Sequence, residues 1–269
     1  MPPCLGSADG DAYDGAVVEL PTCVRLALWV TSAWQGRVSL STALRRSFPD
    51  VDHVEGDLSR IELWHQLGEQ ALFVALPRPG DVTRVPRAAA EALAHAADAG
   101  ECVYAAGLGG ILVPTLTEFG PSGDVGLRIA WTAYDAEPTA RHRLEMIDLG
   151  QIERELLSSL RRHSTALEAA GGFPWDGRHR DAAEDALRAR SWGLPAETPP
   201  RVLRVLSLAA TVSSLAQLGL AGQRSSGAVD AATWDLREGL LRALVADADA
   251  ALGDATNVGV MALAGWRPA

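Results

Sequence analysis

Two histidine–carboxylate pairs are the first candidates for metal or acid–base chemistry in this sequence. His142 and Glu145 stand three residues apart, and so do Asp176 and His179. On a helix this spacing places both side chains on one face, as di-metal carboxylate bundles require. Arg128 would then contact an anionic substrate. Each pair lies among arginines near a break in the helical pattern, so a solvated charged face explains the same residues.

No nucleophile motif accompanies these pairs. The sequence has no Gly-x-Ser-x-Gly elbow, and its three cysteines, Cys4, Cys23 and Cys102, form no Cys-x-x-Cys pair. Cys102 falls in an apolar run typical of a buried strand, where a thiol is usually inert. Cys23 stands at a possible helix start, which would lower its pKa, but no histidine partner can be identified. We therefore expect no cofactor, and a reducing, cytoplasmic location.

The nearest approach to a ligand motif is the glycine-rich segment 107–110 (GLGG), which follows the apolar run ECVYAA. A dinucleotide-binding loop must open a helix, so that backbone amides and the helix dipole meet the phosphate. The next residues, ILVPTLTEF, contain threonines and Pro114, which are unfavourable in a helix interior. The pattern favours a tight turn between two strands, where glycine supplies a positive φ.

Tryptophan is unusually frequent, with eight residues against four phenylalanines and three tyrosines. Trp175, Trp192 and Trp266 lie in connections rich in glycine and proline. An aromatic ring in such a place either pins the loop to the core or anchors a partner. These three residues are the candidates for partner contact.

Composition excludes several classes of protein. Every one of the 24 basic residues is arginine, so the lysine that P-loop NTPases, pyridoxal enzymes and protein kinases need is missing. A net charge of −10 argues against nucleic acid or an anionic membrane as the main partner. The longest apolar stretch, residues 24–34, is too short to span a bilayer and contains Arg25. The N-terminus has no signal-peptide pattern.

The order of elements predicts an α+β fold. An antiparallel meander is expected around 101–135, where strand patterns are separated by turn signals. Residues 22–36 also alternate like a strand, but their length favours a helix. Further helices are expected at 39–48, 61–68, 86–99, 149–171, 178–193, 202–220 and 227–253, and a buried strand at 70–77. We divide the chain into a disordered lead (1–14), an α+β sheet region (15–136), a helical region (137–256) and a tail (257–269).

Two functions fit this pattern. Without a catalytic constellation, the first expectation is a non-enzymatic protein-interaction, assembly or regulatory factor, with a protein partner or with itself as a homodimer through the helical region. The alternative is an enzyme that binds a small molecule or a metal at a site between the sheet and the helices. The two regions either form separate domains or share one core.

Overall fold

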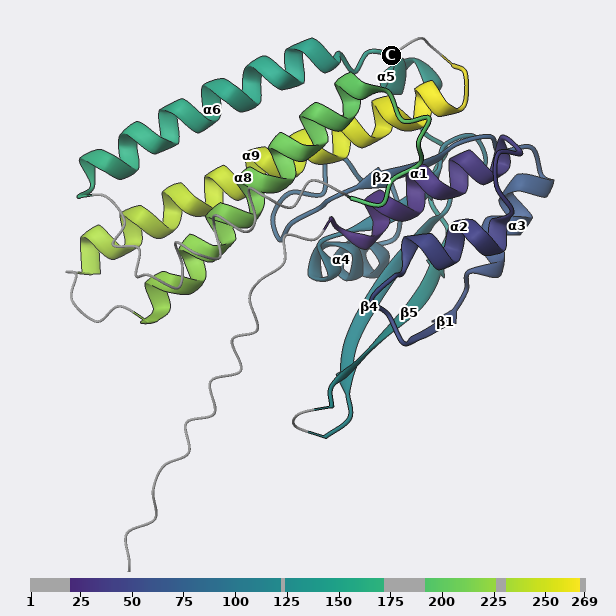
Figure 1. Cartoon of the computed structure of the whole chain (residues 1–269), viewed down its shortest axis with the longest axis horizontal. Coiled ribbons are helices and arrows are strands. Elements are labelled where there is room, and N and C mark those ends of the chain that lie inside the picture. Colours follow the sequence, from purple (N-terminus) through teal and green to yellow (C-terminus); the bar gives the residue numbers. More distant parts are fainter. Residues whose placement is uncertain (1–19, 122–123, 172–191, 226–230, 267–269) are drawn as a thin grey trace, which may run out of the picture.

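The computed structural model describes residues 20–121, 124–171, 192–225 and 231–266. The lead at 1–14 and residues 178–191 of the helix expected over 178–193 lie outside these residues, and the last two residues of that expected helix, 192 and 193, are not helical. Within them, a sheet region and a helical region are joined into an α+β structure, as predicted (Figure 1).

The sheet region is built on five strands in the order β1-β5-β4-β3-β2. Strands β3, β4 and β5 form the predicted antiparallel meander, β2 pairs antiparallel to β3, and β1 pairs parallel to β5. The meander was predictable because its pairing is local, whereas the parallel pairing of β1 is not. The strands are β1 (His53–Gly56), β2 (Leu72–Ala75), β3 (Cys102–Ala105), β4 (Ile111–Phe119) and β5 (Gly126–Tyr134).

The glycine-rich segment is a turn between β3 and β4, as expected. Gly109 and Gly110 have φ values of 81° and 97°. A Cβ at Gly109 would also collide with the carbonyl oxygen of Ala136. The backbone N–H of Leu108 donates to the buried carboxylate of Glu69, so an acidic group already occupies the place that a phosphate would need.

Four helices accompany the sheet: α1 (Thr22–Trp34), α2 (Leu40–Ser47), α3 (Ser59–Gln66) and α4 (Ala90–Ala99). The prediction of a helix over 22–36 is therefore confirmed. Its sequence alternates like a strand because α1 is buried on almost every side, which leaves no polar face to show the helical period. Helix α4 begins at Ala90, four residues after the predicted start at Pro86, and ends at Gly100 with a φ of 74°.

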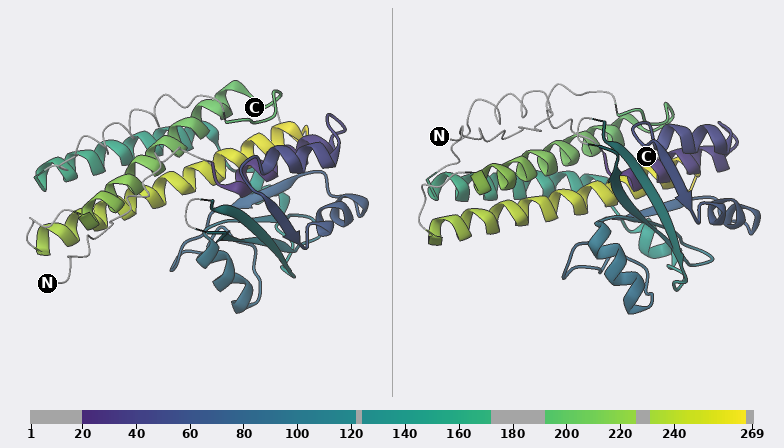
Figure 2. Two further views of the ribbon diagram at one scale, coloured as in Figure 1. Left: turned by 60° about the horizontal axis from the view of Figure 1, so that its bottom comes forward. Right: turned by 90° about the horizontal axis from the view of Figure 1, so that it is seen from below.

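In its described residues, the helical region contains three long helices that lie side by side (Figures 1 and 2). They are α6 (Leu149–Ala169), α8 (Pro200–Ser225) and α9 (Ala231–Leu263), and the short helix α5 (Arg141–Glu145) precedes them. Asp148 caps α6 by accepting a 2.6 Å hydrogen bond from the N–H of Gln151. Helix α9 continues to Leu263, beyond the expected end of the helical region at residue 256.

One helix in the described part of the chain, α8 over Pro200–Ala221, is long and apolar enough to cross a membrane by length and composition alone. Half of this stretch is buried within the structure against neighbouring helices. That burial is typical of the core helix of a soluble domain.

Helix α9 unites the two regions. Its C-terminal half contacts α1 and β2, and buried apolar residues of both regions form one continuous cluster. The amide of Asn257 reaches the outer edge of β2: its Oδ1 accepts from the N–H of Val74, and its Nδ2 donates to the Val74 carbonyl, both at 2.9 Å. Thr31 of α1 accepts from the N–H of Leu72 on the same edge at 3.0 Å. The side chains of Asn257 and Thr31 thus bond to the backbone groups of β2 that would otherwise pair with a sixth strand.

Candidate functional site

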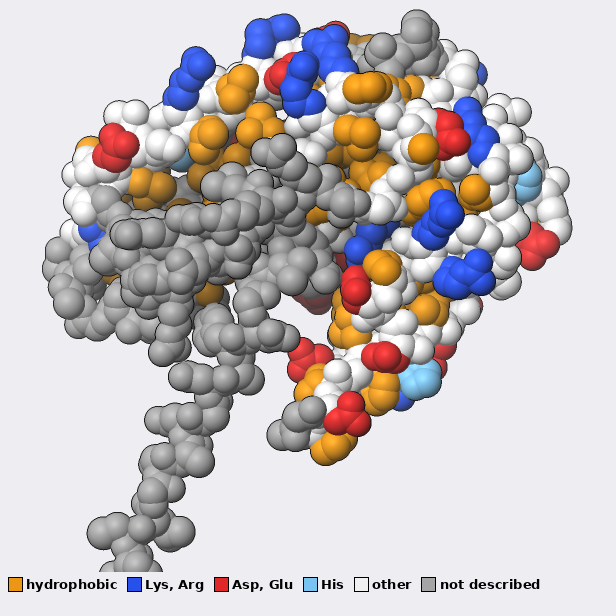
Figure 3. Space-filling model, viewed as in Figure 1, with side chains coloured by type: hydrophobic (Ala, Val, Ile, Leu, Met, Phe, Trp, Pro, Cys, Tyr) orange, Lys and Arg blue, Asp and Glu red, His pale blue; other side chains and the backbone are white. Residues whose placement is uncertain are grey.

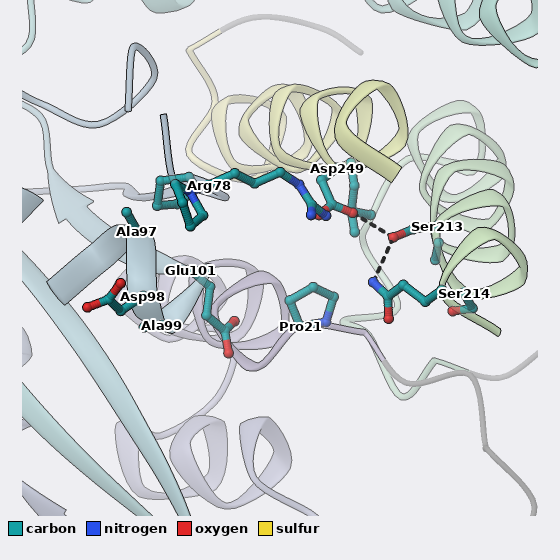
Figure 4. A pocket seen from close by; sticks show the side chains of 15 residues that line it. Pro21, Arg78, Ala97, Asp98, Ala99, Glu101, Ser213, Ser214 and Asp249 are labelled. Atoms are coloured by element: carbon teal, nitrogen blue, oxygen red, sulfur yellow. Dashed lines mark hydrogen bonds and ion pairs between the residues drawn. The ribbon is translucent and has the colours of Figure 1, made fainter. Parts of the chain in front are cut away.

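A cavity of about 400 Å³ lies where the sheet region meets the helical region (Figure 4). The start of α1, the loop after β2 and the end of α4 form one side, and α8 and α9 form the other. The alternative function considered for the sequence, a small-molecule or metal-binding enzyme, would need a site between the sheet and the helices. The polar residues that line the cavity are Arg78, Asp98, Glu101, Ser213, Ser214, Gln217 and Asp249.

On the helical side, a chain of hydrogen bonds crosses the cavity wall. Arg78, from the loop after β2, forms an ion pair with Asp249 of α9. Ser213 of α8 donates to the other oxygen of Asp249 at 2.6 Å, and Gln217 donates to Ser213 at 3.2 Å (Figure 4). The network therefore ties the sheet region to both α8 and α9.

On the sheet side, Glu101 closes the N-terminus of α1. Its Oε2 accepts a 2.7 Å hydrogen bond from the backbone N–H of Cys23, a helix-capping bond made from a distant part of the chain. Pro21 occupies the N-cap position of α1, where no side chain of its own makes the capping hydrogen bond. Burial raises the pKa of Glu101 to about 7, although the Cys23 hydrogen bonds and the charge of Arg25 act in the opposite direction.

Because of these contacts, few polar side chains in the cavity are left to bind a ligand or to take part in a reaction. Arg78 and Asp249 neutralise each other, the Ser213 hydroxyl donates its hydrogen bond to Asp249, and Glu101 serves as a helix cap. Burial raises the pKa of the Cys23 thiol, so it is not a thiolate nucleophile at neutral pH. The arrangement functions as a polar clamp between the two regions.

Breaking this clamp at Arg78 is expected to have a moderate effect. In Arg78→Met, the hydrocarbon stem is kept but Asp249 loses its ion pair, so the free energy of unfolding should fall by about 1 kcal/mol. Urea unfolding followed by circular dichroism measures this change. Arg60→Met is the control, because Arg60 pairs with Asp135, which is almost fully exposed. Equal effects of the two substitutions would contradict the role of the clamp.

A second cluster joins α6 to α9 and contains serine, histidine and aspartate. Ser159 and His163 both bond to Oδ2 of Asp247, the histidine through Nε2 at 3.2 Å, and Arg162 pairs with the same carboxylate at 3.4 Å. In a catalytic triad the histidine would bond to the serine. Here both bond to the acid, so the cluster holds two helices together. Sequence patterns could not reveal it, because Asp247 lies 84 residues from His163.

The metal or anion site expected from the sequence does not assemble in the described part of the chain. His142 is exposed on α5, Glu145 forms an ion pair with Arg141 at 2.7 Å, and Arg128 lies on β5 over the ring of Phe119. Asp176 and His179 lie outside the described residues. Within those residues, no group of three or more His, Cys, Asp or Glu side chains is arranged to hold a metal ion.

Both candidate tryptophans in the described residues make internal contacts. The Nε1 of Trp192 donates to Ser207 of α8 at 2.9 Å. Trp266 packs against Phe73 of β2 with ring centroids 5.4 Å apart, and the guanidinium of Arg141 lies 4.3 Å from the Trp266 ring centroid. These two rings pin their loops to the core, which is the first of the two roles expected for them from the sequence. Trp175 lies outside the described residues.

Comparison with known proteins identifies one family through two domain models. Residues 23–145 match the N-terminal domain of Rv1486c-like protein, and residues 150–253 match its C-terminal domain. The two matches together cover most of the chain, and they meet at the connection between α5 and α6. No curated protein and no solved structure matches the chain.

Proposed function

The chain belongs to the Rv1486c-like family, and we propose that it is a non-enzymatic protein-interaction factor that binds an extended segment of a partner protein along strand β1. The observation that carries this proposal is the uncovered end of the sheet. We call it the flap: β1 together with residues 115–119 of β4 and 126–129 of β5. In Figure 1 the β4–β5 hairpin extends away from the helices.

Strand β1 supports the proposal because it ends the sheet. All four of its residues, 53–56, are exposed, and residues 115–118 of β4 are exposed as well. The opposite edge, at β2, is closed by the side chains of Asn257 and Thr31. An edge strand with free backbone groups is a template for a further strand, which is how several peptide-binding domains work.

A row of apolar side chains crosses the flap, and a partner segment could recognise this row beside the edge of β1. Val54 pairs with Ile129, and Ile129 pairs with Leu116, so the three side chains share one face of the sheet. Ile129 is fully buried, while Val54 and Leu116 are 41% and 44% exposed. A partner strand beside β1 would extend this row and cover Val54.

The charge of the flap indicates what kind of segment fits. Glu55, Glu118 and the turn residue Asp124 contribute negative charge, against the single positive charge of Arg128. Acidic and apolar side chains are interspersed over the projecting hairpin (Figure 3). A segment in which apolar residues alternate with arginine or lysine would complement both features.

Selection from a random-peptide display library on the purified full-length protein tests this function. We expect selected peptides to alternate apolar and basic residues, and to shift the backbone amide NMR signals of 53–56. Val54→Asp should weaken their binding at least about tenfold, because it places a charge in the apolar row. Met146→Asp is the matched control, since Met146 is 79% exposed on the segment after α5. Binding that is unchanged by Val54→Asp, or no selected peptide at all, would refute the proposal.

Self-association and location also remain proposals. A homodimer through the helical region would bury exposed Leu236 of α9, and sedimentation of the wild type against Leu236→Asp tests it. Free, buried Cys23 and Cys102 support a cytoplasmic location, because a reducing compartment keeps such thiols unpaired.

A further inference from the structure

We infer that a second cavity, distinct from the clamp and from the flap, binds a small organic anion that carries an apolar body. This cavity, the arginine groove, has a volume of about 740 Å³. It lies between residues 82–87 of the loop before α4, residues 137–147 around α5, and the part of α9 that contains Asp254 and Asn257. Its volume falls within the range of small-molecule sites.

Positive charge gathers in the groove although the whole chain is acidic. Arg84, Arg87 and Arg143 line it, against the carboxylates of Glu137 and Asp254. Arg84 forms an ion pair with Asp254 at an N–O distance of 3.3 Å. Arg87 and Glu137, whose side chains are exposed, form a longer ion pair of 3.9 Å. Arg143 has no ion-pair or hydrogen-bond partner among the described residues. Its guanidinium is thus available to a ligand.

Tyr104 of β3 also lines the groove. The residue as a whole is only 3% exposed, but its hydroxyl oxygen is accessible to solvent, and no hydrogen bond joins it to another described residue. The hydroxyl can therefore donate to a ligand atom in the groove. Burial raises the pKa of Tyr104, which keeps the hydroxyl a proton donor at neutral pH; the charge of Arg143 acts on it in the opposite direction.

The remaining walls are apolar. Val85, Leu93, Leu144 and Ile147 contribute side chains from the two loops and from α4 and α5. A ligand that places a carboxylate or phosphate against Arg143 and Tyr104 would lay its hydrocarbon part on these residues. Both anionic groups accept the same hydrogen bonds, so the charge and the apolar body define the ligand class.

A matched set of probes tests this inference by calorimetry on the full-length protein. Octanoate and octyl phosphate carry both features, octanol lacks the charge, octyltrimethylammonium reverses it, and inorganic phosphate lacks the apolar body. We expect octanoate or octyl phosphate to bind at least about tenfold more tightly than the other three, and their relative affinities distinguish a carboxylate ligand from a phosphate ligand.

Substitutions then place the binding in the groove. Arg143→Gln should weaken the binding of the better probe about tenfold, and Tyr104→Phe several-fold. Arg143 is exposed, so its replacement should leave the thermal unfolding temperature unchanged. Arg128→Gln on the flap is the control and should have no effect. Octanol binding as tightly as octanoate, binding unaffected by Arg143→Gln, or no binding of any probe would each overturn the inference. None of these outcomes bears on peptide binding at β1.

Discussion

Replacing Asn257 with leucine is expected to lower the free energy of unfolding by about 4 kcal/mol, the largest effect of any single substitution considered for this protein. The side chain is buried and makes two hydrogen bonds of 2.9 Å to the backbone of Val74. Leucine has a similar volume, but it leaves the N–H and the carbonyl of Val74 buried without partners. Each such group costs about 1–3 kcal/mol.

Urea unfolding of Asn257→Leu measures this loss of stability, and Thr256→Val, at the adjacent buried residue, is the control. Thr256 is fully buried, but its hydroxyl donates to Leu252 within its own helix. Its loss leaves that carbonyl with its ordinary helical bond, so less than about 1 kcal/mol is expected. A loss for Asn257→Leu no greater than for Thr256→Val would show that the edge of β2 is held by other contacts.

The two edge strands of the sheet therefore differ in what lies beside their outer backbone groups. At β2, Asn257 and Thr31 satisfy backbone groups that would otherwise be buried and unpaired. At β1, all four residues are exposed, so the backbone groups on its outer side are open to solvent. Since only the open edge has backbone groups available to a partner, the proposed contact at β1 depends on the closure of β2, which leaves one edge for strand addition.

Elements with a local signal were predictable from the sequence. The meander of β3, β4 and β5 follows from alternating apolar residues and short turns, and α6 from its apolar stripe and the cap at Asp148. Strand β1 was not predicted. Its residues, HVEG, are all exposed and show no alternation of burial, and its partner β5 follows some 75 residues later.

The candidate sites were largely beyond prediction, because their residues come together from distant segments. Arg78 and Asp249 are 171 residues apart, and Cys23 and Glu101 are 78 apart. No spacing rule connects such pairs. The His142 and Glu145 pair, by contrast, has the spacing of a metal site, but Glu145 is paired with Arg141 and His142 is exposed. Local spacing therefore indicates a shared helix face and does not by itself define a site.

Replacing Glu101 with glutamine is expected to change how stability depends on pH. The pKa of Glu101 is raised from 4.5 to about 7, chiefly because burial disfavours the charged carboxylate. Between these two values the native protein holds a proton that the unfolded chain has released. The free energy of unfolding of the wild type therefore falls as pH rises through this window, by up to about 1.4 kcal/mol per pH unit.

Glutamine keeps an oxygen that can accept from the N–H of Cys23, and it has no charge to bury. The two proteins should have similar stability near pH 4.5, and Glu101→Gln should be more stable by about 3 kcal/mol at pH 8. Denaturant unfolding from pH 4.5 to 8 measures the difference in stability between the two proteins, in which the contributions of groups that do not interact with Glu101 cancel. A difference that stays constant with pH would mean that Glu101 is ionised throughout the range and that the Cys23 hydrogen bond outweighs its burial. In that case the clamp would hold a permanent charge at the start of α1.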